Sequence, residues 1–232
     1  MRLLSVTIFA FLSAAIAAPA GAASLTLDEL TTPLTRTVRV TSAPGPVPEG
    51  SFVATGLKMN DGVSSFIAWC FDLTHQIAKG GPYTYTATDT PFSNSFLTAG
   101  AKDRAERLFN ANYGSVDAYD AVQASAFQLA LWEVAYDSNF DLTSGQFQGT
   151  GRGSFAAQIA STAAGYLQAA SGFSGRGGWK VTFLENQNER TRQNLVTASP
   201  VPLPAALALL GGGLAALGAV RRRAVLKQRE NA

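Results

Sequence analysis

Two apolar segments, one at each end of the chain, most constrain what it can fold into. The first is the run 3–18, which follows a basic Arg2 and precedes the small-residue site Ala20-Gly21-Ala22. A basic start, a short apolar run and an A-x-A site are the features that signal peptidase recognises. The run is also shorter than the roughly 20 residues of a membrane span, which favours cleavage over an anchor. We predict a signal peptide over 1–23 and export of the remaining chain.

The second apolar segment lies near the other end. Leu203 to Val220 is uncharged throughout, and three arginines follow it. A buried core helix is the alternative, but a triple glycine and a triple arginine suit a membrane end better. We predict a transmembrane helix at about 203–220 with a basic end at 221–232. By the positive-inside rule the arginines stay in the cytoplasm, so the body of the protein faces outward.

This tail also contains a short motif ahead of the apolar run. Its distinctive residues are Val201, Pro202, Leu203, Pro204 and Ala205 before the run, and Arg221, Arg222 and Arg223 after it. The order resembles the VPLPA-CTERM sorting signal, a relative of the PEP-CTERM signals of Gram-negative bacteria. The resemblance implies that an exosortase-type enzyme removes the tail, 199–232. The protein would then pass from the inner membrane, with its body in the periplasm, to the cell surface or extracellular matrix.

Removing the predicted ends leaves a body the size of one domain, with a lead-in segment, 24–50, and an ectodomain, 51–198. The whole chain has a net charge of +2, but six of its 18 lysines and arginines lie in the end segments. The body therefore holds 12 basic and 15 acidic residues. This balance gives no support for a nucleic-acid partner.

Hydrophobic periodicity divides the body into strands, then helices, then strands again. Alternation and β-branched or aromatic residues predict strands at Thr37–Val40, Ser51–Leu57, Ser64–Leu73, Tyr83–Thr88, Trp179–Leu184 and Asn194–Thr197. A period near 3.6 predicts helices at Thr98–Asn110, Asp117–Tyr136 and Ser154–Ala170. The glycine-rich stretch 149–153 is interpreted as a flexible connector. We expect an α+β fold, an antiparallel β-sheet or sandwich with an inserted layer of about three helices, plus the C-terminal transmembrane helix.

Cysteine usage is unusual for an exported chain. Cys70 is the only cysteine, so no disulfide can form within one molecule. Three interpretations stay open: a buried inert thiol, an intermolecular or catalytic thiol, or a cysteine consumed in another covalent bond. A second oddity is Gln128, which lies in the apolar helix 117–136. A buried glutamine is costly unless its amide finds partners, and the ordinary interpretation is a core residue bonded to a loop backbone.

One hypothesis joins the two oddities. The sulfur of Cys70 attacks the side-chain amide of Gln128, expels ammonia and leaves an internal thioester. Holding the two groups together in a shared cavity supplies a high effective concentration. An apolar surround from Trp69, Phe127 and Trp132 would protect the thioester from water. The thioester is then an electrophile for an amine or hydroxyl on a surface target.

The two segments resemble the bacterial Cys-Gln thioester domain of surface proteins. That family has a cysteine after an aromatic residue on a strand and, much later, a Thr-Gln-x-Ala-x-Trp segment. Cys70, Gln128, Ala130 and Trp132 match its cysteine, glutamine, alanine and tryptophan. The threonine position holds Phe127 instead. The resemblance spans roughly 51–196 and implies covalent attachment of a non-enzymatic surface or adhesion protein.

Two further functions remain as alternatives: a purely structural exopolysaccharide-associated module, and a small exported hydrolase. The only histidine, His75, is expected to be a solvated loop residue, since five residues from Cys70 is awkward for a catalytic pair. The run Asp137 to Asp141 weakly suggests calcium, but no closing glutamate follows, and a turn capped by its own side chains is favoured. We expect no cofactor and no metal. The expected partners are signal peptidase, the sorting enzyme, the membrane and a covalent surface target.

Overall fold

A computed structural model describes residues 22–32, 37–92, 96–175, 177–187 and 192–202. The predicted signal peptide, apart from its last two residues, and the predicted transmembrane helix with its basic end lie outside the described residues. Within the described ranges no helix is both long enough and apolar enough to span a membrane.

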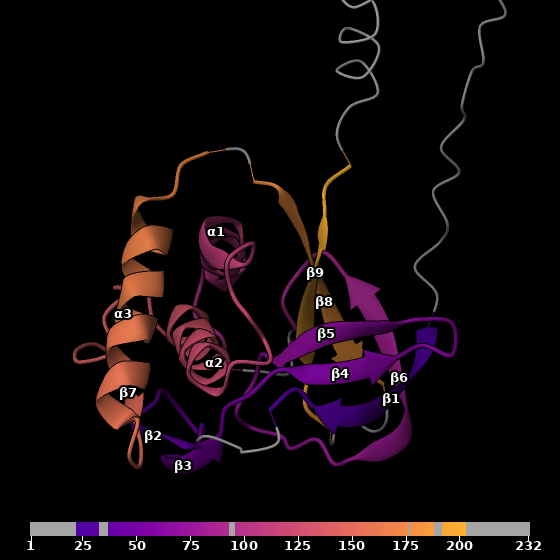
Figure 1. The fold of residues 1–232 in the computed structure, drawn as a ribbon, viewed down its shortest axis with the longest axis horizontal. Helices are drawn as coiled ribbons and strands as arrows, with labels where there is room; N and C mark the ends of the chain where they lie inside the picture. Colours follow the sequence, from indigo (N-terminus) through magenta and orange to yellow (C-terminus); the bar gives the residue numbers. More distant parts are fainter. Residues whose placement is uncertain (1–21, 33–36, 93–95, 176, 188–191, 203–232) are drawn as a thin grey trace, which may run out of the picture.

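Six antiparallel strands close into a barrel, on the right of Figure 1. In their order around the barrel they are β1 (Ala22–Leu30), β4 (Leu57–Asn60), β5 (Ser65–Cys70), β9 (Leu195–Pro200), β8 (Trp179–Asn186) and β6 (Gly80–Thr88). The hairpin between β4 and β5 turns at Asp61, whose carboxylate accepts from the backbone amides of Val63 and Ser64. The α+β class and the antiparallel sheet expected from the sequence are confirmed, and the sheet closes into a barrel, which the sequence analysis did not specify.

Three helices cover the side of the barrel. They are α1 (Ala101–Asn112), α2 (Ala121–Tyr136) and α3 (Ala156–Gly172). α2 begins at Asp120, whose side chain accepts from the amides of Val122 and Gln123 as an N-cap. It lies between α3 and the barrel (Figure 1), and every residue from Ala124 to Tyr136 is buried. A helix that is apolar on all sides is stable only where neighbours enclose it.

A second sheet of three strands lies beneath the helices. Its order is β3 (Gly50–Val53), β2 (Thr37–Ser42) and β7 (Gln148–Gly151). β7 occupies much of the stretch interpreted as a flexible connector, so that interpretation was wrong. Close packing explains it, because a Cβ on Gly151 would lie 2.4 Å from the carbonyl oxygen of Ala156. Glycine lets β7 approach α3 closely, but it has no preference for strands that a sequence pattern could detect.

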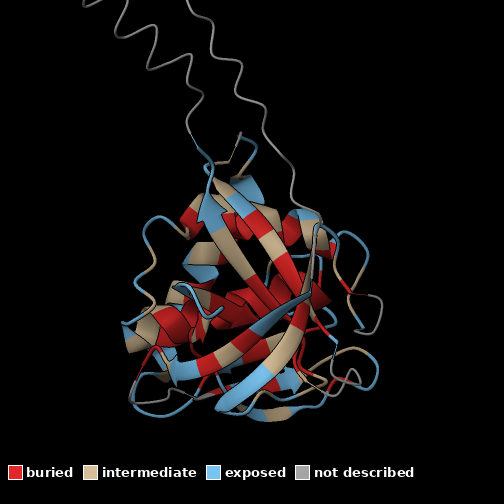
Figure 2. Cartoon of the chain, turned by 90° about the vertical axis from the view of Figure 1, so that its right-hand side faces the viewer, coloured by how far each residue is buried: buried red, intermediate tan, exposed pale blue. Residues whose placement is uncertain are grey.

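The segment 24–50 contributes to both sheets. β1 pairs with β4 and β6 in the barrel, and β2 pairs with β3 and β7. Figure 2 shows the buried residues gathered between the sheets and along the helices, with the exposed ones at the strand ends and loops. The core is therefore continuous from the barrel into the helical layer, and the residues where β5 meets α2 lie inside it.

Candidate functional site

The Gln128 amide lies directly on the backbone of Cys70. The amide nitrogen of Cys70 donates to Gln128 Oε1 at 3.0 Å, and Gln128 Nε2 donates to the carbonyl oxygen of Cys70 at 2.7 Å. Gln128 is fully buried, and Cys70 is 8 % exposed. The amide is therefore fixed beside the cysteine by two hydrogen bonds, and the desolvation cost of burying it is offset.

Strand register explains why Cys70 has backbone groups to spare. On one side β5 pairs with β9, and there the amide of Phe71 bonds to Asn194. The N–H and C=O of one strand residue point to the same side of the strand, and those of the next residue point to the other side. Because the amide of Phe71 points toward β9, the N–H and C=O of Cys70 point toward β4. β4 starts only at Leu57, which pairs with Ala68. The Gln128 side chain thus takes the place of the strand neighbour that Cys70 lacks.

The thiol of Cys70 lies in a setting that keeps its proton. Burial, together with the negative charge of Asp72, raises the pKa of the Cys70 thiol far above its ordinary value. The sulfur is therefore a neutral thiol at physiological pH. Any reaction of it must include a path for this proton.

A cavity of about 460 Å³ opens beside the pair. Cys70 and Trp132 line it together with residues around β3 and the start of β4, residues of the loop after β5, Leu30 at the end of β1 and Gln193 before β9. Trp132 is buried, and its indole Nε1–H has no hydrogen-bond partner within the described part of the chain. A molecule entering the cavity would reach Cys70, whereas the indole nitrogen of Trp132 is buried.

The loop after β5 holds His75 on the rim of the same cavity, which the sequence did not predict. Asp72 is fully buried, and its Oδ1 accepts from the backbone amides of Thr74 and His75 and from Thr74 Oγ1. The His75 ring reaches the same oxygen through Nδ1 at 3.2 Å, and its side chain is 23 % exposed. His75 is thus a partly exposed loop residue, but it is held against Asp72 rather than surrounded by solvent. The only signal in the sequence was the Asp-x-x-His spacing at a strand end.

The three aromatic residues expected to surround the pair divide into two groups. Trp132 lines the cavity with Cys70, as described above. Trp69 and Phe127 pack on each other, with ring centroids 4.8 Å apart, and both contact Tyr113 just beyond α1. Because successive side chains of a strand point to opposite faces, Trp69 lies behind Cys70 rather than over it.

The acidic run after α2 forms a turn held by its own side chains, as favoured from the sequence. The Asp137 carboxylate accepts from the amides of Gln146 and Phe147, and Asp141 accepts from the amide of Thr143. Over the described ranges no group of three or more histidine, cysteine, aspartate or glutamate side chains could hold a metal ion.

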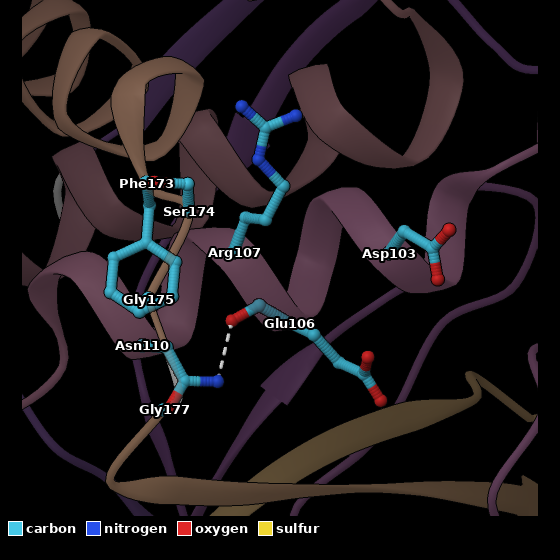
Figure 3. A pocket seen from close by; sticks show the side chains of 8 residues that line it. All are labelled: Asp103, Glu106, Arg107, Asn110, Phe173, Ser174, Gly175 and Gly177. Carbon is cyan, nitrogen blue, oxygen red and sulfur yellow. Dashed lines mark hydrogen bonds between the residues drawn. The ribbon is translucent and has the colours of Figure 1, made fainter.

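A second hollow, of about 350 Å³, lies between α1 and the segment after α3 (Figure 3). Two of its polar side chains, Arg107 and Asn110, already have partners in the protein. Arg107 donates to the carbonyl oxygens of Ala170 and Ser171, and it points away from the Glu106 carboxylate in Figure 3. Asn110 bonds to the carbonyl of Glu106 and to the amide of Trp179. We assign no function to this hollow.

Two residues of the predicted sorting motif, Val201 and Pro202, lie in the described part of the chain. Both are exposed directly after β9, and the amide of Val201 bonds to Gly178. The remaining sorting residues, Leu203 to Ala205 and Arg221 to Arg223, lie outside the described residues.

No protein-family model matches this chain, and no curated protein matches it. Among solved structures, it is similar to the N-terminal domain of the Streptococcus pyogenes pilus tip adhesin Cpa. That likeness has a TM-score of 0.45 and 17 % identity and covers 72 % of this chain and 94 % of that one. It is also similar to an N-terminal thioester domain of a Clostridium perfringens surface protein, solved as a cysteine-to-alanine mutant (TM-score 0.40, 13 % identity, 71 % of this chain and 99 % of that one). A third similar structure is the N-terminal thioester domain of the fibronectin-binding protein SfbI from S. pyogenes. That likeness has a TM-score of 0.36 and 12 % identity and covers 76 % of this chain and 98 % of that one.

Proposed function

We propose that this chain is an exported surface protein that forms a thioester between Cys70 and Gln128 and uses it to attach covalently to a target. The observation that carries the proposal is the pair of hydrogen bonds that fix the Gln128 amide on the Cys70 backbone, 3.0 and 2.7 Å long. The cavity reaches the pair from the cysteine side, because Cys70 is part of its lining.

Bond formation balances without any added reagent. The Cys70 sulfur bonds to the side-chain carbonyl carbon of Gln128, and the carbon–nitrogen bond of the amide breaks. The thiol proton leaves with the amide nitrogen as ammonia. The hydrogen bond from the Cys70 amide to Gln128 Oε1 polarises the carbonyl under attack and persists in the product.

Intact mass of the full-length protein, purified in detergent, tests the proposal. We expect a mass lower by one ammonia than the sequence requires, and a Cys70 that resists thiol alkylation until methylamine opens the thioester. Cys70→Ala should restore the calculated mass while the protein stays folded. A wild-type protein of full calculated mass with an unreacted thiol would contradict the proposal.

A structural module with no thioester is the second candidate. Its support is that both polar atoms of the Gln128 amide already have hydrogen-bond partners, as a stable core requires. The same mass measurement separates the two candidates. A structural pair would keep its ammonia, and methylamine would not change its mass.

Export and sorting are the remaining part of the proposal. The exposed position of Val201 and Pro202 after β9 leaves the start of the motif accessible to an enzyme. Altering Pro202 and Pro204 should leave export intact but keep the full-length form in the membrane fraction. Protease added to spheroplasts should digest the body. A body that stays protected would contradict the proposed orientation.

A further inference from the structure

The cavity beside Cys70 has a mixed apolar and polar lining that is almost free of charge. Its described lining contains no aspartate, glutamate, lysine or arginine, and His75 is its only ionisable group besides Cys70. Uncharged hydrogen-bonding side chains line it instead: Ser51, Thr55, Thr74, Gln76 and Gln193. Aromatic rings supply the rest of one wall, where Phe52 meets Trp132 edge to face at 6.0 Å.

We propose that the target group is a hydroxyl of a carbohydrate and that His75 is the general base that activates it. This inference rests on the proposed thioester, and it adds the class of target and a catalytic residue to it. The product is an ester between the target and the side chain of residue 128.

Geometry supports His75 as the base. Its Nδ1 contacts Asp72 Oδ1 at 3.2 Å, and the buried Asp72 is itself fixed by the amide of Asn194 at 2.8 Å. A carboxylate at Nδ1 favours the tautomer with its proton there, which leaves Nε2 as a proton acceptor. His75 and Cys70 line the same cavity, so a hydroxyl bound there has the base and the cysteine end of the thioester in one wall.

Charge selects a hydroxyl over an amine. A lysine ammonium entering this cavity would lose its water without meeting a free carboxylate, and that desolvation is costly. Asp72 does not compensate, because it does not line the cavity and five hydrogen bonds already engage it. A neutral hydroxyl avoids this cost but is a weak nucleophile, so it needs a base.

The aromatic and uncharged groups of the lining point to a carbohydrate. Phe52 and Trp132 both line the cavity, beside the uncharged hydrogen-bonding side chains named above. Aromatic rings beside uncharged hydrogen-bonding groups match the apolar C–H faces and hydroxyl groups of a sugar.

The capture step balances as follows. The target oxygen bonds to the side-chain carbonyl carbon of residue 128 while its proton passes to His75 Nε2. The carbon–sulfur bond breaks, and the Cys70 sulfur takes the proton from His75. An ester and a free thiol result, with the histidine restored and no co-reactant consumed.

The full-length protein in detergent, with its thioester verified by mass, is incubated with glycerol or methyl α-glucoside, and with methylamine in parallel. We expect adduct masses with both hydroxyl compounds, and release of these adducts by hydroxylamine, which cleaves esters. His75→Ala and His75→Gln should slow ester formation by about 100-fold or more, the usual contribution of a general base. Opening by methylamine, whose free-base form needs less help, should change by less than about threefold. Gln158→Ala, on an exposed position of α3 outside the cavity lining, is the control and should leave ester formation unchanged.

Each other outcome overturns the inference. A wild-type protein that reacts with methylamine but forms no ester leaves the thioester intact as a proposal and removes the hydroxyl target. Equal slowing of both reactions in the His75 variants assigns the residue a structural role. His75 variants that no longer form the thioester would assign His75 to thioester formation rather than to capture of the target. A wild-type protein without the ammonia loss removes the proposed function and this inference together.

Discussion

Among the polar side chains that α2 buries completely, Gln128 and Glu133 have opposite hydrogen-bonding environments. Both polar atoms of Gln128 are hydrogen-bonded to Cys70, at 3.0 and 2.7 Å. Glu133, five residues along the same helix, accepts one bond from the amide of Asp141 at 3.1 Å through Oε1, and its Oε2 has no partner in the described part of the protein. Burial raises the pKa of Glu133 to about 8.

This difference helps to distinguish a buried polar residue in a candidate reactive site from one that is only incompletely satisfied. Gln128 is neutral and fully partnered, and its amide is held on the backbone of the chain's one cysteine, which suits the proposed reaction. Glu133 is protonated at neutral pH and faces the acidic turn after α2, where Asp137 and Asp141 raise its pKa further. Its burial weakens the protein as soon as the group ionises. An unsatisfied buried acid is therefore not by itself evidence of a site.

The largest effect on thioester formation and stability should come from replacing Gln128 with a carboxylic acid, the group that Glu133 carries. Gln128→Glu removes the leaving group and, once ionised, sets a negative charge against the carbonyl oxygen of Cys70. We expect complete loss of the ammonia-deficient mass and a free, alkylatable thiol. Stability should fall on the order of 3 kcal/mol, measured by urea unfolding, because a buried acceptor faces another acceptor. The matched control is Glu133→Gln, which should keep the thioester. A Gln128→Glu protein that still resists alkylation would contradict the site.

Phe127 beside Gln128 gives the next prediction. Phe127 is buried among Trp69 and Phe109, with ring centroids 4.8 and 5.1 Å away, and its ring packs in this cluster away from the Gln128 amide bonds. Phe127→Thr, the residue of the resembled family, should therefore cost about 3–5 kcal/mol through the cavity left behind. Thioester formation in the folded fraction should persist, as measured by intact mass. Loss of the thioester without loss of stability would show that this position orients the amide.

Glu133→Gln tests the other half of the comparison through pH. The folded pKa of Glu133 is raised from 4.5 to about 8, so between these values the folded state holds a proton that the unfolded state has lost. Wild-type stability therefore falls with rising pH across this window, by up to about 1.4 kcal/mol per pH unit, and levels off above pH 8. The variant should match wild type near pH 4 and exceed it at pH 8 in urea unfolding. Parallel pH profiles would mean that Glu133 ionises freely.

The smallest effect is expected at the start of α2, away from both buried groups. Asp120→Ala removes the N-cap contacts to the amides of Val122 and Gln123. Loss of such a cap costs about 1 kcal/mol. The thermal midpoint should fall by a few degrees while the mass and alkylation behaviour of Cys70 stay those of wild type. A changed rate of Cys70 alkylation would mean that the position of α2 along its axis controls thioester formation.

Local periodicity predicted the helices and most strands, because these depend on residues near in sequence. The expected helix 117–136 became α2, and the expected strand 64–73 became β5. Barrel closure was not predictable, since it depends on β1 joining β4 to β6 and β9 joining β5 to β8. β7 was missed because its glycines serve the close approach of α3.

For the site, composition was informative where a residue was out of place. A lone cysteine and a glutamine in an apolar helix stood out, and the structure brings them together. His75 did not stand out, because a histidine in a polar loop is ordinary. Its position depends on the buried carboxylate of Asp72, which is held by Asn194 from the other end of the chain. No local pattern encodes a contact between residues that far apart.

The hydrogen bonds between Cys70 and Gln128 join residues 58 positions apart, one in the barrel and one in the helical layer. A thioester at this point would close a covalent ring in a chain that has no disulfide, and a ring of this size stabilises a fold by roughly 4 kcal/mol. Capture of a target would cut that ring. The protein with its thioester intact would then be the more stable form, and the attached protein the less stable one. Attachment would therefore remove the covalent link between the barrel and the helical layer.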